Sequence, residues 1–103
     1  MGKIVLSNNA SLRLKSISNF YETRDKAIAE RAINTIIAAF QLLRKFPEAG
    51  RPWRGSLTRR ELVIPFGEQG FVSLYEIVRE TNEIVILAIK HQREAGYPSE
   101  GSN

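Results

Sequence analysis

Apolar residues recur at two different spacings, which divide the chain into a helical first half and a strand-rich second half. A short β-rich run at residues 3–7 opens the chain. Between residues 10 and 45, apolar residues recur every three or four positions, as they do on one face of a helix. From residue 60 to residue 90 they form three short runs separated by turn-forming residues, which is typical of strands. The predicted order is therefore one strand, two helices and three strands.

The two helices are predicted at residues 10–24 and 26–45, and each is preceded by residues that can cap it. Ser7, Asn8 and Asn9 precede the first helix and Asp25 precedes the second; their side-chain oxygens accept hydrogen bonds from unpaired first-turn amides. Pro47 ends the second helix, because the residue before a proline avoids the helical conformation. Joined by one or two residues, the helices should form an antiparallel hairpin. Each should bury one apolar face, made of Leu14, Ile17, Phe20 and Tyr21 on the first and Ala29, Ile33, Ile36, Ile37, Phe40 and Leu43 on the second.

The three later strands are predicted at residues 60–66, 71–79 and 83–90. Pro65 places the first of them at a sheet edge, since proline has no amide hydrogen for a ladder. The last is apolar from residue 84 to residue 89, so we expect a central strand that is covered on both faces. With the first strand, this predicts an α+β fold of order β-α-α-β-β-β: a mostly antiparallel four-stranded sheet packed by a helical hairpin.

Length and composition narrow the class of protein. A chain of 103 residues fits one domain, predicted at residues 1–97, with a disordered tail at residues 98–103. The chain has no cysteine and a single histidine, which argues against a thiolate or zinc site, and we predict neither metal nor cofactor. The sequence has no membrane-length apolar run and no apolar signal-peptide core, so we expect a cytoplasmic protein that does not contact membranes.

Positive charge is concentrated in one part of the chain. The net charge is +4, and residues 44–60 hold six basic side chains and one acidic one. This stretch contains a segment rich in proline and glycine, residues 47–58, which we call the basic loop. Such an excess attracts an anionic partner, although a solvated loop would have the same composition. Trp53, between Arg51 and Arg54, is either an exposed stacking platform or part of a cation–π contact within the loop, and we favour the second.

The last predicted strand ends at Lys90-His91-Gln92-Arg93, where the only histidine emerges among cations. Metal-free cleavage of RNA needs a base, an acid and cations around one phosphate. His91 or Glu61 are candidates for the base or the acid. Arg60 and Arg93 are candidate phosphate clamps, because the planar guanidinium makes two parallel hydrogen bonds. Tyr97 is a candidate acid or a platform on which a base stacks.

Each candidate also has a structural interpretation. His91 at a strand end can be hydrogen-bonded to a loop carbonyl rather than act as a catalyst. The arginines can form exposed ion pairs with Glu61, Glu76 or Glu94, which contribute only about 0–1 kcal/mol each. Tyr75 lies in the middle of a strand and is expected in the core.

Four segments in this order resemble the RelE/ParE superfamily, the toxins of type II toxin–antitoxin systems. The resemblance covers about residues 3–97 and rests on LLRKFPEAGRPW (42–53), RELV (60–63), GFVSLYEIV (70–78) and IVILAIKHQRE (84–94). It implies one of two activities. RelE-like members are ribosome-dependent endoribonucleases that cut mRNA, and ParE-like members are thought to poison DNA gyrase. Both kinds are neutralised by an antitoxin whose extended, partly helical segment wraps the toxin.

One departure from the RelE-like pattern favours the ParE-like activity. RelE-like nucleases typically carry an arginine just after the aromatic residue of the segment GFVSLYEIV, and Val72 stands at that position. We therefore expect a ParE-like gyrase inhibitor that acts by binding and is neutralised by an acidic, partly disordered antitoxin. The residues expected to bind partners are Arg51, Trp53, Arg54, Arg59, Arg60, His91 and Arg93.

Two alternatives to this interpretation stay open. The first is a ribosome-dependent, metal-independent mRNA endonuclease that uses His91, Arg93, Arg60 and Tyr97. The second is a non-toxic relative that acts only as a binding partner in a complex.

Overall fold

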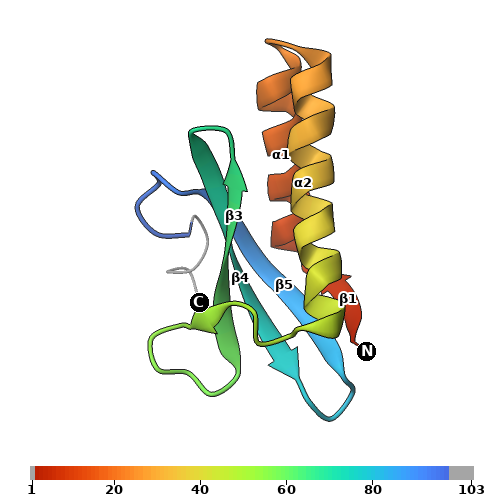
Figure 1. Ribbon diagram of the computed structural model, residues 1–103, viewed down its shortest axis with the longest axis vertical. Coiled ribbons are helices and arrows are strands. Elements are labelled where there is room, and N and C mark those ends of the chain that lie inside the picture. Colours follow the sequence, from red (N-terminus) through yellow and green to blue (C-terminus); the bar gives the residue numbers. More distant parts are fainter. Residues whose placement is uncertain (1, 98–103) are drawn as a thin grey trace.

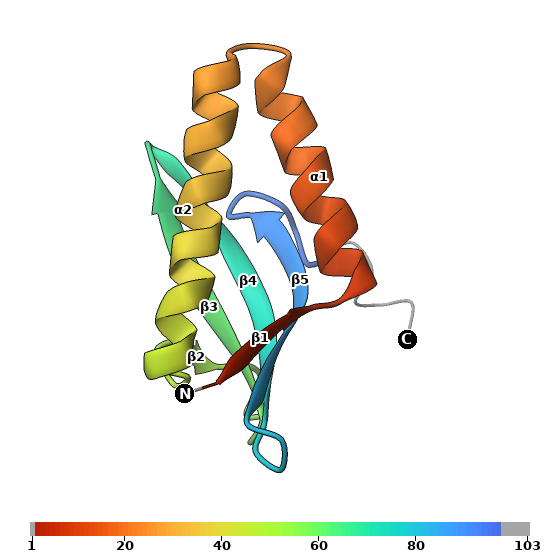
Figure 2. The ribbon, with the colours of Figure 1, turned by 90° about the vertical axis from the view of Figure 1, so that its right-hand side faces the viewer.

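The computed structural model describes residues 2–97 and places a helical hairpin on one face of a five-stranded sheet (Figures 1 and 2). The strands follow the order β1-β5-β4-β3-β2 across the sheet. β1 runs parallel to β5, and the other neighbours are antiparallel. The fold is therefore α+β, with the predicted elements in the predicted order and one additional short strand. Its elements are β1 (Lys3–Leu6), α1 (Asn8–Glu22), α2 (Lys26–Lys45), β2 (Arg51–Pro52), β3 (Arg59–Phe66), β4 (Gln69–Val78) and β5 (Glu83–His91).

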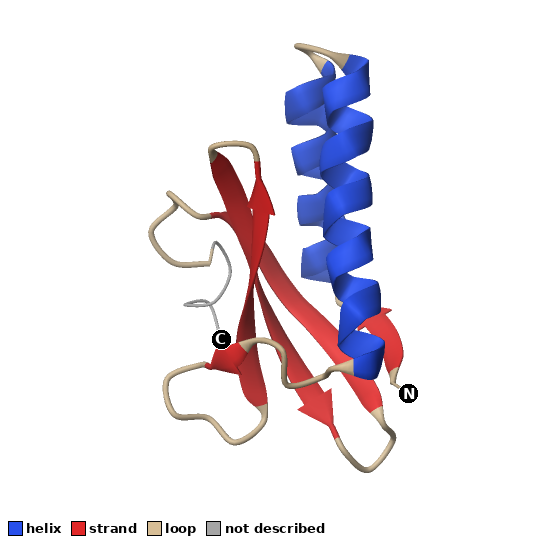
Figure 3. Ribbon diagram, viewed as in Figure 1, coloured by secondary structure: helices blue, strands red, loops and turns tan. Residues whose placement is uncertain are grey.

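The strand β2 was not predicted, and the expectation of a four-stranded sheet was wrong. Arg51 and Pro52 pair with Glu61 and Arg60 at the start of β3. β2 is a short strand flanked by loop segments (Figure 3). Two residues carry no alternating pattern, so its sequence resembles the rest of the basic loop. β2 pairs only with the first part of β3, and Pro65 lies beyond it, on the free edge of the strand. Within the described residues, no strand there needs the amide hydrogen that proline lacks.

Both helices begin at a predicted cap. Ser7 Oγ accepts a hydrogen bond from the amide of Ala10 at 3.0 Å, and α1 begins two residues earlier than predicted. Asp25 Oδ1 accepts one from the amide of Ala27 at 2.8 Å, and α2 has the predicted limits. Such caps typically stabilise a helix by about 1 kcal/mol. No helix within residues 2–97 is long and apolar enough to cross a membrane.

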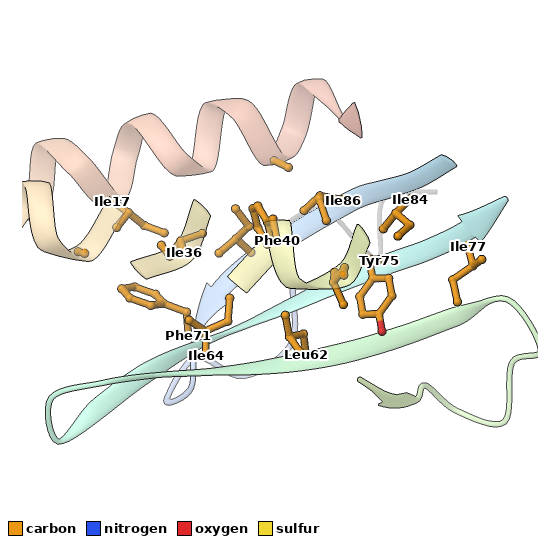
Figure 4. Packing of buried hydrophobic residues seen from close by; sticks show 14 residues of the cluster. Ile17, Ile36, Phe40, Leu62, Ile64, Phe71, Tyr75, Ile77, Ile84 and Ile86 are labelled. Carbon is orange, nitrogen blue, oxygen red and sulfur yellow. The ribbon is translucent and has the colours of Figure 1, made fainter. Parts of the chain in front are cut away.

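The core lies between the hairpin and the sheet (Figure 4). Ile17 and Ile36 from the helices meet Phe71 and Tyr75 from β4 there, and all four are almost completely buried. Burying an aliphatic side chain of this size stabilises the fold by roughly 1.5–3 kcal/mol. Two residues predicted for the core lie at the margins of their helical faces instead: Phe20 is 45% exposed and Ile37 is 42% exposed.

A β-bulge in β5 reverses the direction of its side chains. Leu74 pairs with Ala88, and the next residue of β4, Tyr75, pairs with Ile86, so Leu87 has no partner in the ladder. Ile86 packs in the core, whereas Ala88 packs on the opposite face. Leu87 itself is only half-buried. The prediction that both faces of this strand are covered is therefore confirmed for the face that packs on the hairpin, whereas the opposite face is only partly covered.

Candidate functional site

The face of the sheet turned away from the hairpin, which we call the open face, carries a small buried cluster. It consists of Val72, Leu74, Ala88 and Tyr97, with Trp53 and Leu87 packed against it. Tyr97 belongs to the turn after β5, residues 92–97, which we call the C-terminal turn. Residues 53–58 of the basic loop and the C-terminal turn both lie on this side of the sheet (Figure 1). Val72 is 6% exposed, so it packs inside this cluster.

Glu61 connects these segments through both of its carboxylate oxygens. The Tyr97 hydroxyl donates a hydrogen bond to Glu61 Oε2. Arg51 donates two to Oε1, from Nε at 3.1 Å and from Nη2 at 2.6 Å. Burial acts to raise the pKa of Glu61, but the hydrogen bonds from Tyr97 and Arg51 and the charges of Arg51 and Lys90 outweigh it, so the pKa lies below its ordinary value. Glu61 is therefore ionised and fully engaged at neutral pH.

Lys90 is a buried cation on the open face that sequence analysis did not select. It lies directly across from Val72 in the β4–β5 ladder and is only 9% exposed. Its Nζ donates to the Glu94 carbonyl at 2.7 Å and lies 5.5 Å from the centre of the Tyr97 ring. The sequence could have indicated this residue, because Lys90 is a charged residue in a mostly apolar strand. An unpaired buried charge is costly, so such a side chain is expected to have a polar or aromatic partner.

Arg60 faces the hairpin and holds the basic loop in place. Its Nε donates to the Gly50 carbonyl at 2.7 Å, and its Nη2 donates to the Glu48 carbonyl at 3.2 Å. The buried Tyr75 hydroxyl donates to the Pro47 carbonyl at 2.7 Å and accepts from the Gly50 amide at 2.9 Å. Burial raises the pKa of Tyr75. Together these two side chains fix the chain between α2 and β2.

His91 also faces the hairpin, where it packs among aromatic rings. Its ring centre lies 5.0 Å from that of Phe71, 6.0 Å from Phe20 and 6.2 Å from Tyr21. Within residues 2–97 its ring contacts are aromatic, in place of the expected hydrogen bond to a loop carbonyl. Burial lowers the pKa of His91, and the charge of Arg13 lowers it further while that of Glu94 opposes. The ring is therefore mainly neutral at pH 7.

The four residues considered for RNA cleavage do not meet around one point. Arg60 and His91 face the hairpin, but they pair with Tyr75 and Phe71 respectively. Those positions are four residues apart on β4, which is about 13 Å along a strand. Tyr97 lies on the open face, and Arg93 is exposed in the C-terminal turn.

The expected ion pairs of these arginines are made by other residues. Arg59 pairs with Glu76 at 3.3 Å, Arg51 pairs with Glu61, and Glu94 pairs with Arg13. The salt-bridge partners that were considered for Arg60 and Arg93 are thus occupied. Arg93, which was also considered for partner binding, is exposed to solvent.

The basic loop is an ordered cationic surface. The Arg54 guanidinium lies 4.3 Å from the centre of the Trp53 ring, which confirms the predicted cation–π contact. Ser56 Oγ accepts hydrogen bonds from the amides of Thr58 and Arg59 at 3.1 and 2.9 Å. Arg51 and Arg54 remain exposed despite these contacts. A partner would therefore meet arginines whose backbone is already fixed, which limits the entropy lost on binding.

Comparison with known proteins places the chain in a family. Residues 4–96 match the model of the ParE toxin of the type II toxin–antitoxin system parDE. The chain belongs to the ParE toxin family. It is 30% identical over 94 residues to the toxin RelE3 of Caulobacter vibrioides, an alignment that covers 91% of this chain and 98% of the relative. The chain is thus a toxin of the RelE/ParE superfamily, as the sequence predicts.

Solved structures share the fold of this family. The chain resembles a chain of the chromosomal ParDE system of P. aeruginosa with a TM-score of 0.68 and 22% identity, covering 87% of this chain and 95% of that one. It resembles the isolated RelE toxin of E. coli with a TM-score of 0.60 and 12% identity, covering 99% and 96%. A chain of the intact E. coli RelBE toxin–antitoxin complex gives 0.55 at 12% identity, covering 86% and 94%. At these identities the likeness shows the fold alone.

Proposed function

We propose that this toxin inhibits growth by binding DNA gyrase and blocking the resealing of cleaved DNA. The observation that supports binding over chemistry is the division of the candidate residues between two faces of the sheet. Arg60 and His91 are packed on the hairpin side, whereas Tyr97 is bonded to the Glu61 carboxylate on the open face. A carboxylate repels a phosphate, and the position of the expected arginine holds the buried Val72.

The cationic surface is the proposed contact with the gyrase–DNA complex. It combines Arg51 and Arg54 of the basic loop with Arg59 of β3 and Arg93 of the C-terminal turn. Positive side chains near DNA gain affinity by releasing counterions from its backbone, which makes binding weaken as salt rises. The surface is ordered by Tyr75, Arg60 and Glu61, so it needs no rearrangement before it binds.

An antitoxin is the second proposed partner. The structural relatives include chains from the ParDE system and from the RelBE toxin–antitoxin complex. For this chain we propose an antitoxin that is acidic where it meets residues 44–60. A partly disordered antitoxin would lose entropy on binding, offset by the large surface that it wraps. Toxin, antitoxin and target would meet in the cytoplasm.

Expression in cells separates these proposals from the alternatives. The toxin would be induced with and without a candidate antitoxin encoded by a small reading frame beside its gene, while DNA breaks and protein synthesis are recorded. We expect DNA breaks before any fall in protein synthesis, and rescue by the antitoxin. Unimpaired growth without the antitoxin would instead indicate a non-toxic relative.

A ribosome-dependent mRNA endonuclease is the second candidate function. Two observations favour it: the similarity to a toxin named RelE3, and the cation of Lys90 opposite Val72 beside Tyr97. This function predicts codon-positioned cuts of mRNA in a translation extract. The cuts would be abolished by His91→Ala or Arg93→Ala. Intact mRNA in that extract, with toxicity retained in cells, would exclude it.

A further inference from the structure

Leu57, in the loop between β2 and β3, is more exposed than any other large apolar side chain of residues 2–97. Its exposed fraction is 93%, whereas the exposed leucines of the two helices, Leu12 and Leu42, are 59% and 47% exposed. Burial stabilises a fold in proportion to the apolar area that it removes from water. Leu57 therefore contributes almost nothing to the stability of the fold in this way.

A tight turn precedes this leucine. The Ser56 amide donates to the Trp53 carbonyl at 2.9 Å. The two residues between them have positive φ angles, 51° at Arg54 and 72° at Gly55, which is the pattern of a type I′ turn. The chain therefore enters Leu57 from a closed, hydrogen-bonded turn.

The main chain after Leu57 is also fixed. The Thr58 amide donates to Ser56 Oγ at 3.1 Å, and the Thr58 carbonyl accepts from the Ile77 amide of β4 at 2.9 Å. Leu57 is thus held between two hydrogen-bonded residues, in an ordered loop that extends away from the helical hairpin (Figure 1).

Trp53 anchors this loop to the sheet. It packs against the buried cluster of the open face, and the Arg54 guanidinium lies 4.3 Å from the centre of its ring. The indole is therefore engaged within the protein, and Leu57 is the apolar side chain that residues 53–58 present to a partner.

Arginines flank the exposed leucine on both sides in the sequence. Residues 51–60 contain four arginines and no acidic residue. Arg54 is exposed at the turn itself. Arg51 and Arg59 are paired with carboxylates of β3 and β4, yet 67% and 42% of their side chains stay exposed. An exposed apolar side chain among cations fits DNA, because cations contact its phosphates and an apolar wedge can enter between its base pairs.

We propose that Leu57 inserts between two base pairs of DNA while the neighbouring arginines contact the phosphates on either side. Because the main chain around Leu57 is already ordered, insertion costs little conformational entropy. The wedge unstacks one base step and kinks the duplex, so flexible steps such as TA are preferred.

This inference rests on the proposed binding of the gyrase–DNA complex and names the contact that would block resealing. A base step that Leu57 holds unstacked beside the cleaved bond keeps the broken ends from realigning. The toxin would then act on the DNA of the complex through one apolar side chain, with the arginines supplying affinity that weakens as salt rises.

A DNA duplex with 2-aminopurine at a TA step tests the insertion directly, because the fluorescence of this base rises when it unstacks. We expect saturating wild-type toxin to raise the fluorescence about twofold, and Leu57→Ala to lose most of that rise. Leu57→Phe, which keeps a wedge, should retain it. Leu12→Ala removes an exposed leucine from α1 and is the matched control. The salt dependence of binding should be alike in all four proteins, because their phosphate contacts are the same.

A cleavage assay with gyrase and supercoiled plasmid connects the insertion to the activity. We expect Leu57→Ala to yield about 10-fold less linear DNA than the wild-type toxin. Leu57→Phe and Leu12→Ala should match the wild-type toxin. Because Leu57 is almost fully exposed, its replacement should leave the folded structure intact, which urea unfolding of each variant checks.

The outcomes separate this inference from the proposed function. Wild-type toxin that fails to bind the duplex, or binds it without unstacking 2-aminopurine, would overturn the insertion. Undiminished gyrase poisoning by Leu57→Ala would also overturn it and leave the proposed function intact. Lost poisoning in Leu57→Ala with no effect on base stacking would place Leu57 in a pocket of gyrase itself, against the proposal. Unstacking by a wild-type toxin that leaves gyrase cleavage unchanged would support the insertion and overturn the proposed function.

Discussion

The hydroxyl of Tyr97 donates a hydrogen bond to Oε2 of Glu61, across the open face of the sheet. Arg51 binds the other carboxylate oxygen, so a single side chain joins the C-terminal turn, β3 and the basic loop. Val72 packs in the same cluster as Tyr97. The Tyr97 ring therefore covers part of the open face, and the Glu61 carboxylate has partners at both oxygens. These contacts hold the basic loop and the C-terminal turn in place as an ordered binding surface.

Removing the Tyr97 hydroxyl should destabilise the fold. In Tyr97→Phe, Glu61 keeps Arg51 but loses one hydrogen bond at a partly buried oxygen, and we expect the free energy of unfolding to fall by about 1–3 kcal/mol. Urea unfolding measures it. Tyr21→Phe is the matched control, because Tyr21 makes ring contacts and no hydroxyl hydrogen bond within the described residues. Equal stability of the two variants would contradict the role given to this contact.

Removing the Tyr75 hydroxyl should loosen the basic loop. Tyr75→Phe leaves the Gly50 amide and the Pro47 carbonyl without their partner, which should cost about 1–3 kcal/mol. Because the hydroxyl fixes the entry to the loop, we also expect trypsin to cleave after Arg54 faster than in the wild-type protein. Peptide mass analysis during brief digestion measures this. Faster cleavage after Arg24, at the far end of the hairpin, would indicate general unfolding instead.

The single histidine makes stability depend on pH in a predictable direction. Burial lowers the pKa of His91 in the folded chain, with help from Arg13 and against Glu94, while the unfolded value is about 6.5. The unfolded chain therefore binds the proton more readily, and stability falls as the pH drops through 6.5 toward the folded pKa.

His91→Phe keeps a ring in the aromatic cluster and removes the titration. Unfolding free energies at pH 7.5 and 5.5 give the loss of stability for each protein. We expect a larger loss for the wild-type protein than for His91→Phe. Identical losses would mean that His91 titrates alike in the folded and unfolded chains.

Local patterns predicted the elements of this fold well. The caps Ser7 and Asp25, the helix limit at Pro47 and the central position of β5 all follow from interactions within a few residues or from a continuous apolar run. Phe20 and Ile37 show the limit of this reasoning, since an apolar residue at the margin of a helical face can be buried or exposed. β2 was beyond reach because two residues cannot show a periodicity.

Side-chain placement across the sheet was less predictable. The bulge at Leu87 shifts every later residue of β5 to the opposite face, and it puts His91 and Lys90 where simple alternation from Ile84 would not. Arg60 and Glu61 are neighbours in sequence but serve opposite faces, which separates residues that had been grouped in one candidate site. The separation of Arg60 from Glu61 could have been predicted, because successive residues of a strand point to opposite faces. The bulge could not, because nothing in the sequence indicates it.

A cleavage assay with purified gyrase tests the central claim most directly. Supercoiled plasmid, gyrase and ATP would be incubated with the toxin, and linear DNA counted after denaturing the enzyme. We predict that linear DNA accumulates with toxin concentration and that Arg54→Glu in the basic loop reduces it at least 10-fold. Lys26→Glu, the same charge change at the far end of the hairpin, should leave it unchanged. Supercoiling and linear DNA that stay at their toxin-free levels at micromolar excess would contradict the proposal that this protein poisons gyrase.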